Sequence, residues 1–181
     1  VAPLLTKSPD EIWPTVVCDE HEQALGLVWS NLESVREAVN SQAGVYLSRR
    51  RGVWKKGETS GATQDLLRVE LDCDRDALRF IVRQHGSGFC HNNTWTCWGK
   101  GSGLSSLFRN LYQRKETAPC GSYTKRLLND KELLALKLRE EIEELILAET
   151  KEEAIWEAAD VLYFLLVSMC HKGISLAEVE T

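Results

Sequence analysis

The chain has 181 residues, of which 43% are hydrophobic, and a formal net charge of −5. Its length suits one ordinary domain or two small ones with a packed core. The negative net charge argues against general nucleic-acid binding, because the overall field repels polyphosphate chains. No apolar run approaches the roughly 20 residues that cross a bilayer, and residues 1–6 lack a signal-peptide pattern. Six cysteines in a chain of this length suit a reducing compartment, so we expect a cytoplasmic protein with no membrane partner.

The first half is expected to form short strands around one helix. Asn31 is a natural N-cap for a helix over residues 31–40. Strand candidates cover residues 44–47, 65–72 and 77–83. Apolar and polar residues alternate in the second candidate, so one face would carry Leu67, Val69, Leu71 and Cys73. Asp72 and Asp74 would then project from the other face.

Residues 46–61 combine five cations with glycines and hydroxyl side chains. Gly57 and Gly61 allow the backbone to approach a ligand closely, and Thr59 and Ser60 can donate hydrogen bonds. Arg and Lys side chains can neutralise phosphate charge. This segment is typical of a phosphate cradle, and the alternative is an exposed basic loop. Because the cations are concentrated locally in an acidic chain, the expected ligand is a small phosphorylated molecule.

Carboxylates and thiols interleave after the second strand candidate. They are Asp72, Asp74 and Asp76 with Cys73, Cys90 and Cys97, and His91 directly follows Cys90. Thiolates favour Zn²⁺ and carboxylates favour Mg²⁺, so the span can hold both ions. Zinc lowers the pKa of a bound water to about 7, and magnesium can hold a phosphorylated substrate. The alternatives are a solvated acidic turn and half-buried thiols, because the two later cysteines lack zinc-finger spacing.

The second half is expected to be helical. Residues 104–114 can form a helix, and the polar stretch that follows, with Pro119 and Gly121, predicts a linker. Apolar residues recur at helical spacing over residues 131–149. A further helix begins at the capping box that Thr150 opens, and Gly173 can end it in a left-handed conformation.

These last two helices carry a second acidic group. Glu141 and Glu144 share one face of the first helix, and Glu157 and Asp160 repeat that spacing on the second. In an antiparallel pair the four carboxylates would converge and hold magnesium bridged by a pyrophosphate. The alternative is a solvated charged face. Asp160 favours the metal site, because it lies in an apolar run where an unpaired carboxylate is costly.

Residues 25–98 resemble phosphoribosyl-AMP cyclohydrolase, an enzyme of histidine biosynthesis. The resemblance rests on residues 48–54 and 57–61, on Asp72-Cys73-Asp74 with Asp76, and on Cys90-His91 with Cys97. Residues 121–179 resemble phosphoribosyl-ATP pyrophosphohydrolase. That resemblance rests on residues 121–124, Arg126-Leu127, Lys137, Glu140-Glu141 with Glu144, and Glu157 with residues 160–163. The tandem order is similar to the fungal fused histidine-biosynthesis proteins, in which a histidinol dehydrogenase domain follows; this sequence contains no such domain.

The resemblance implies an α+β protein. A β-rich cyclohydrolase domain would cover residues 1–114, a linker residues 115–120, and an all-α pyrophosphohydrolase domain residues 121–181. The implied activity is hydrolysis of phosphoribosyl-ATP to phosphoribosyl-AMP and pyrophosphate, and then opening of the adenine ring by zinc-activated water. A homodimer is also implied, because the family's cyclohydrolase site forms between two subunits.

The resemblance implies functional roles for particular residues. The zinc ligands would be Cys73, Cys90 and Cys97, and the magnesium ligands Asp72, Asp74, Asp76, Glu141, Glu144, Glu157 and Asp160. The catalytic residues would be His91, Glu141 and Asp160, where His91 either transfers a proton or orients Cys90. The substrate-binding residues would be Arg49, Arg51, Trp54, Lys56, Glu58, Thr59, Ser60, Gly61, Ser122, Tyr123, Thr124, Arg126 and Lys137. Lys55 and Ala62 depart from many bacterial cyclohydrolases, which have His at both positions.

Two other functions remain open from the residues. The helical half could be a general nucleotide pyrophosphatase, although Ser122, Tyr123 and Thr124 favour the histidine-pathway type. Alternatively, the thiols could hold a structural zinc and the helices could form an interface, in a non-catalytic fragment.

Overall fold

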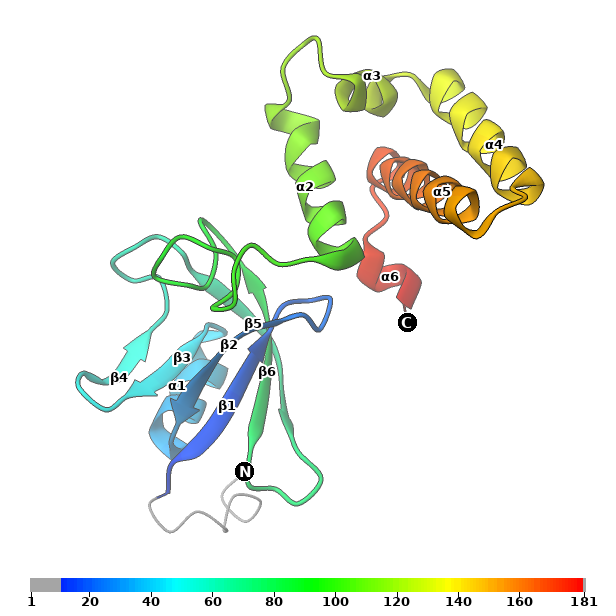
Figure 1. Ribbon diagram of the computed structural model, residues 1–181. Coiled ribbons are helices and arrows are strands. Elements are labelled where there is room, and N and C mark those ends of the chain that lie inside the picture. Colours follow the sequence, from blue (N-terminus) through cyan, green and yellow to red (C-terminus); the bar gives the residue numbers. More distant parts are fainter. Residues whose placement is uncertain (1–10, 181) are drawn as a thin grey trace. The chain divides into compact units, whose positions relative to one another are not determined.

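The computed structural model describes residues 11–180 and divides into two compact units, Val1–Gly101 and Ser102–Thr181, which are described separately (Figure 1). Residues 1–6, on which the signal-peptide expectation rests, lie outside the described range. The expected α+β class is confirmed, with a curled mixed sheet in the first unit and helices in the second. The division between units falls earlier than the predicted boundary at residue 114. The helix α2 (Gly103–Thr117) continues into the predicted linker, so it belongs wholly to the second unit.

The first unit is built on one six-stranded sheet in the order β4-β3-β2-β1-β6-β5. The strands are β1 (Trp13–Cys18), β2 (Ala24–Ser30), β3 (Val45–Ser48), β4 (Gly52–Lys55), β5 (Gln64–Leu71) and β6 (Leu78–Gln84). Only β1 and β6 are parallel neighbours among these strands; the other pairs are antiparallel. Three of the six were predicted as strands at nearly these bounds.

One helix, α1 (Leu32–Ser41), packs against β2, β3 and β4. It begins as predicted, because the Asn31 side chain accepts a hydrogen bond from the Ser34 backbone N–H at 2.9 Å. Its apolar face supplies Val35 and Ala38 to the core of the sheet. The strands supply the remaining core side chains, which include Val17, Leu25, Val45, Tyr46, Phe80 and Val82.

The strand β5 departs from the predicted alternation. A bulge between Leu66 and Arg68 inserts Leu67 as an extra residue, and its side chain is 45% exposed. A bulge shifts the alternation of side chains on the strand that contains it. Leu67 was therefore placed on the wrong face, whereas Val69 and Leu71 do pack against the core.

The second unit contains five helices within the described residues. They are α2, α3 (Tyr123–Asn129), α4 (Lys131–Leu147), α5 (Lys151–Lys172) and α6 (Leu176–Glu180). The long helix α5 packs against α2, α3 and α4, and its ends are those predicted. Thr150 forms the capping box, and Gly173 ends the helix with a φ of 72°. The core of this unit is made of apolar side chains from these helices, including Phe108, Leu111, Leu127, Phe164, Val167 and Met169.

By length and composition alone, α5 could cross a bilayer, which the sequence analysis did not foresee. Its second half is the centre of the helical core, and Val167 and Cys170 there are fully buried. A core helix of this kind is apolar for the same physical reason as a membrane helix. Its first half carries Glu157 and Asp160, so the two halves differ in character.

Candidate functional site

One cavity of the first unit, of about 880 Å³, brings together two segments that are far apart in the sequence. Residues from the range 51–62 line one part of it, residues from the range 87–97 line another, and Val28 of β2 also contributes. The predicted substrate-binding residues on its wall are Arg51, Trp54, Lys56, Glu58, Thr59 and Ser60. The predicted zinc ligands Cys90 and Cys97 and the predicted catalytic His91 line the same cavity.

The loop that bears Thr59 and Ser60 depends on two glycines. Gly57 has a φ of +83°, and a Cβ there would lie 2.4 Å from the backbone of Ala62 and Thr63. Only glycine fits so close an approach, so this loop folds back on itself at Gly57. Gly61, also at positive φ, donates its backbone N–H to the Gly57 carbonyl at 2.8 Å. Gly61 shapes the loop and is not among the residues that line the cavity.

The two predicted phosphate-binding arginines have different surroundings. The Arg51 guanidinium lies 5.1 Å from the centre of the Trp54 ring, and both residues line the cavity. The Arg49 guanidinium instead lies 5.0 Å from the Trp29 ring, and Arg49 is not on the cavity wall. Such stacking restrains a long side chain and contributes about 0.5–1 kcal/mol at exposed sites.

Lys56 is the buried cation of this cavity, with only 8% of its surface exposed. Its ammonium donates to the Ala62 carbonyl at 3.2 Å and lies 5.6 Å from the centre of the Phe89 ring. Burial lowers the pKa of Lys56, and the neighbouring Cys97 and Cys90 thiolates act in the opposite direction. Lys56 therefore supplies positive charge beside both thiols.

The thiols Cys90 and Cys97 are close enough to hydrogen-bond, and their surroundings make them unequal. The Asn92 backbone N–H, followed by the Thr94 hydroxyl, lowers the pKa of Cys90. Burial and the charge on Cys90 raise the pKa of Cys97. The His91 Nδ1 lies 3.9 Å from the Cys90 sulfur, which is compatible with both roles considered for His91. Two soft sulfur donors with a neighbouring imidazole are a donor set that zinc accepts.

Cys73 does not join these thiols within one chain. β5 ends at Leu71, so Cys73 lies in an exposed turn with Asp72, Asp74 and Asp76 and not on a strand face as expected. Among the residues that the structure describes, no cluster of three potential metal ligands contains a cysteine.

The three aspartates of that turn do converge, with one carboxylate oxygen of each within 4.8 Å of the others. Asp72 organises the turn, because its Oδ1 accepts the backbone N–H groups of Asp76 at 2.9 Å and Ala77 at 3.1 Å. Both bonds lower the pKa of Asp72, and the bond from Ala77 has the larger effect. The group is exposed and consists of oxygen donors, which suits magnesium.

Sequence reasoning missed the residues that support the thiols. A Cβ on Gly26 would lie 2.3 Å from the Phe89 ring and 3.0 Å from the Cys97 sulfur. The Cys97 backbone N–H donates to the Leu25 carbonyl at 2.8 Å. No local pattern marks Gly26, because its partners lie more than sixty positions away in the sequence.

The second unit places carboxylates of α4 and α5 together. Glu141, Glu157 and Asp160 each offer an oxygen within 4.8 Å of the other two, as the helical spacing predicted. Glu144 adjoins Glu157 without entering this closest group. Partial burial and the charge of Glu144, and then those of Glu141 and Asp160, raise the pKa of Glu157. A cation would relieve this repulsion, and an all-oxygen donor set fits magnesium.

The argument that Asp160 is buried was wrong. Asp160 is exposed, whereas Glu141 is 6% exposed and is the buried carboxylate of the group. The apolar residues near Asp160 were assumed to be core, but Ile155 and Trp156 are 58% and 72% exposed. Apolar neighbours in the sequence do not bury a residue when no other element of its unit covers that face of the helix.

Lys137 lies within this acidic group. Its ammonium is 2.8 Å from a Glu140 oxygen and 3.2 Å from a Glu141 oxygen. These partners, Glu140 first, raise the pKa of Lys137. Lys137 therefore holds the buried Glu141 carboxylate in place in the absence of a metal ion.

The predicted substrate-binding residues around α3 separate into two groups. Ser122, Tyr123 and Arg126 line a cavity of about 510 Å³. Thr124 is buried, and its hydroxyl is 2.9 Å from the Tyr163 hydroxyl of α5. Thr124 thus fixes α3 against α5 and does not line the cavity.

Comparison with known protein families assigns each half of the chain. Residues 26–99 match the model of phosphoribosyl-AMP cyclohydrolase, and residues 104–181 match that of phosphoribosyl-ATP pyrophosphohydrolase. The chain is 36% identical to the histidine biosynthesis bifunctional protein HisIE of Pyrococcus furiosus, over 93% of this chain and 88% of that protein. The chain belongs to this bifunctional family. Both halves are hydrolase domains of histidine biosynthesis.

Longer relatives contain the same region. The histidine biosynthesis trifunctional protein of Komagataella pastoris is 51% identical over 99% of this chain, which spans 21% of that protein. The bifunctional protein his7 of Schizosaccharomyces pombe is 49% identical over 96% of this chain, which spans 42% of that protein. The chain thus covers about a fifth of the length of the trifunctional relatives.

Proposed function

We propose that this chain catalyses two consecutive hydrolyses of histidine biosynthesis. The helical unit would convert phosphoribosyl-ATP to phosphoribosyl-AMP and pyrophosphate, and the β-rich unit would open the adenine ring of phosphoribosyl-AMP. The observation that carries this proposal is the cavity where a basic, hydroxyl-rich segment meets the thiols Cys90 and Cys97. The free cysteines suit a reducing compartment, so we place both reactions in the cytoplasm.

In the β-rich unit, different cavity residues would have different roles in ring opening. The positive charge of Arg51 would attract the phosphate of phosphoribosyl-AMP, and the hydroxyl groups of Thr59 and Ser60 would donate hydrogen bonds to it. Trp54 offers an aromatic face on the same wall. His91, whose Nδ1 lies 3.9 Å from the Cys90 sulfur, would move a proton during attack on the ring. Zinc held by the thiols would supply a water with a pKa of about 7.

In the helical unit, pyrophosphate release would use the carboxylates of α4 and α5. Glu141, Glu157 and Asp160 would hold magnesium, which neutralises phosphate charge when bound. Lys137, which pairs with Glu141 at 3.2 Å, would transfer to a substrate phosphate, because its side chain is flexible. Ser122, Tyr123 and Arg126 provide a neighbouring polar wall for the rest of the substrate.

We infer that the zinc site is completed in a homodimer. Catalytic zinc sites commonly use three protein ligands, and one chain brings together only two of the three predicted thiols. Cys73 lies exposed in its turn, where it is available to a second copy. Exposed apolar side chains in both units, such as Leu27 and Trp156, offer surface for an interface.

Mixing two inactive variants tests the shared site. Cys73→Ser and Cys97→Ser chains should each lack ring opening alone. Co-expressed, they should recover roughly a quarter of wild-type ring opening, because half of the dimers are mixed and each mixed dimer has one intact site. Recovery would be measured as ring-opened product per mole of dimer. No recovery above the separate variants would contradict a site shared between chains.

The activity itself is tested by incubating purified protein with phosphoribosyl-ATP, magnesium and zinc. Pyrophosphate should appear first and ring-opened product second, both followed by chromatography. Absence of both products would contradict the proposal. Comparable turnover of ordinary deoxynucleoside triphosphates would favour a general nucleotide pyrophosphatase, and tight zinc binding without hydrolysis would favour a non-catalytic zinc protein.

A further inference from the structure

The turn between β1 and β2 is built around a fully buried carboxylate. Asp19 is 0% exposed, and its Oδ1 accepts the backbone N–H groups of His21 at 3.1 Å and Gln23 at 2.9 Å. Its own backbone N–H donates to the Gln23 carbonyl at 3.0 Å. A buried carboxylate is costly unless it is hydrogen-bonded, and these bonds satisfy one of its two oxygens. Asp19 lies outside residues 26–99, which match the cyclohydrolase family.

The second oxygen of Asp19 reaches the loop that carries the thiols. The Trp95 indole Nε1 donates to Asp19 Oδ2 at 3.2 Å. Trp95 lies between Cys90 and Cys97, and its carbonyl accepts the Phe89 backbone N–H at 3.1 Å. Beyond it, Cys97 is bonded through its backbone to Leu25 of β2. The thiol loop is thus closed on itself between Phe89 and Trp95, attached to β2 through the Cys97 backbone, and joined to the β1–β2 turn by the indole.

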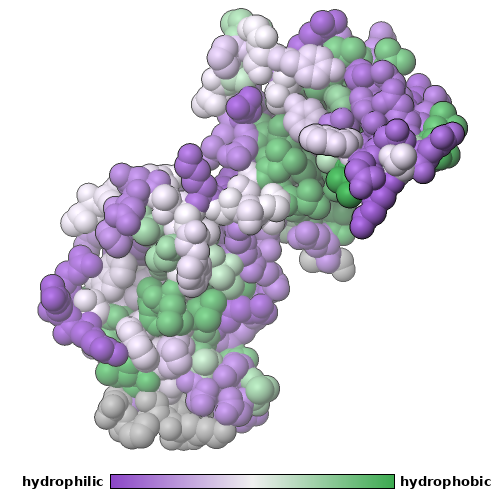
Figure 2. All heavy atoms as spheres, viewed as in Figure 1, coloured by the Kyte–Doolittle hydropathy of each residue, from purple (hydrophilic) through white to green (hydrophobic). Residues whose placement is uncertain are grey.

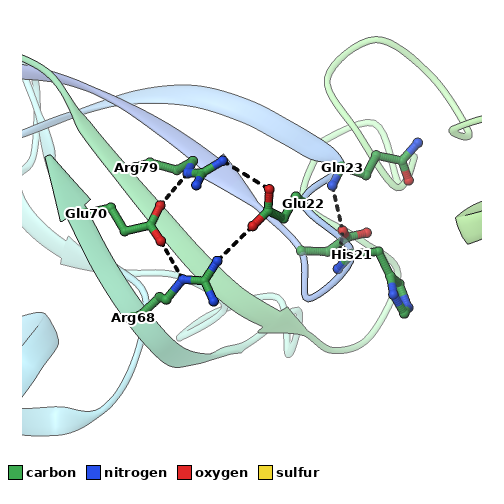
Figure 3. A network of polar contacts seen from close by, with 7 residues as sticks. His21, Glu22, Gln23, Arg68, Glu70 and Arg79 are labelled. Carbon is green, nitrogen blue, oxygen red and sulfur yellow. Dashed lines mark hydrogen bonds and ion pairs between the residues drawn. The ribbon is translucent and has the colours of Figure 1, made fainter. Parts of the chain in front are cut away.

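The same turn is attached to the sheet on its other side. Glu22 pairs with Arg68 at 2.7 Å and with Arg79 at 3.2 Å, and both arginines also pair with Glu70 (Figure 3). These pairs are exposed, so each contributes little to stability, but four contacts in a closed network restrain the turn on β5 and β6. The turn is therefore a fixed support from which Asp19 can hold Trp95.

We propose that Asp19 and Trp95 are positioning residues for the zinc site, because their hydrogen bond sets the separation of the Cys90 and Cys97 sulfurs. This inference rests on the proposed function. Metal affinity depends on how well ligands are held before the metal arrives, and loss of an outer partner typically lowers it by about 10- to 100-fold. The Oδ1 of Asp19 holds the turn, and its Oδ2 holds the thiol loop through Trp95.

The test compares zinc retention by Trp95→Phe and wild-type protein against a competing chelator. Phe keeps a six-membered aromatic ring but loses the pyrrole part of the indole with its N–H, so this variant should bind zinc about tenfold more weakly. The charge-transfer absorption of the Co²⁺-substituted protein should shift as well, because it reports the arrangement of the thiolates. Trp98→Phe is the matched control, since Trp98 adjoins Cys97 but is 69% exposed, and it should retain zinc like wild type.

Asp19→Asn completes a double-mutant cycle. Asn cannot accept bonds through both side-chain heteroatoms, so it should also weaken zinc binding. In a Trp95→Phe background the same change should add little, because the bond is already absent. Pyrophosphate release should be unchanged in each variant, which verifies that the helical unit is intact. Should Asp19→Asn fail to fold, Trp95→Phe alone decides the outcome.

The inference and the proposed function fail in different ways. Wild-type protein that holds no zinc would overturn the proposed function and this inference with it. Wild-type protein that holds zinc, together with a Trp95→Phe variant that holds it equally tightly, would overturn the inference alone. A Trp95→Phe variant with a lower melting temperature but unchanged zinc affinity and Co²⁺ spectrum would assign the bond to stability and would likewise overturn it.

Discussion

Replacing Cys97 by Ser should abolish ring opening of phosphoribosyl-AMP while leaving pyrophosphate release unchanged. Cys97 lines the cavity with Cys90, and a serine hydroxyl is a much poorer zinc ligand than a thiolate. Loss of a direct ligand should lower zinc affinity by more than the roughly 100-fold typical of losing an outer partner. The carboxylates of α4 and α5 belong to the other unit and should keep their activity. Zinc content by mass spectrometry and separate assays of the two products measure these effects.

Cys120→Ser is the matched control for this prediction. Cys120 is also free and exposed, but it lies in the helical unit and outside the thiol cavity. Its replacement should leave zinc content and ring opening at wild-type values. Equal loss of both activities in Cys97→Ser would mean that the two units do not function separately.

Local signals in the sequence predicted the helices well. The Asn31 cap, the Thr150 capping box and the left-handed Gly173 are local in origin, because each depends on residues within a few positions. The helical pair placed Glu141, Glu157 and Asp160 together for the same reason, since the spacing within each helix fixes the face. Features with short sequence range were therefore the predictable ones.

Features that depend on contacts between distant segments were not predicted from the sequence. The bulge at Leu67 depends on how β5 pairs with β6, and no pattern within β5 records it. The bond from Trp95 to Asp19 joins residues 76 positions apart. The predicted zinc ligands also did not reveal their separation, because Cys73 follows the strand end whereas the other two belong to a loop anchored elsewhere. The sequence predicted ligand types but not which of these residues one chain brings together.

Exposure was the property most easily misjudged. Asp160 was judged costly to bury from its apolar neighbours, yet Trp156 and Leu162 of the same helix are 72% and 39% exposed. Hydrophobic residues, in green, are also visible on the surface of the helical unit (Figure 2). Hydrophobic side chains accumulate on an uncovered helix face as well as in a core. The buried acid is Glu141, which the polar run around it gave no reason to select. Because Glu141 and not Asp160 is the buried acid, the stability expected of variants at these two positions changes as well.

Glu141→Gln and Asp160→Asn should each abolish most pyrophosphate release, and they should differ in their effect on stability. Each removes one carboxylate from the closest group on α4 and α5, so magnesium affinity and the attack of water should both suffer, by about 100-fold or more if Glu141 also acts as a base. Glu143→Gln is the matched control, because Glu143 is exposed on α4 outside that group.

Stability separates a functional carboxylate from a merely tolerated one. Asp160 is exposed, so its neutralisation recovers no burial cost; it only removes repulsion with Glu157, whose pKa the neighbouring carboxylates raise. Without magnesium, Asp160→Asn should therefore melt slightly higher than wild type, and added magnesium should stabilise the wild type more than the variant. Glu141→Gln removes the buried carboxylate from its ion pair with Lys137, so this variant should instead melt lower than wild type. Thermal unfolding with and without magnesium, beside pyrophosphate release and ring opening of supplied phosphoribosyl-AMP, tests both variants. Full pyrophosphate release by Asp160→Asn, with an unchanged response to magnesium, would remove Asp160 from the site.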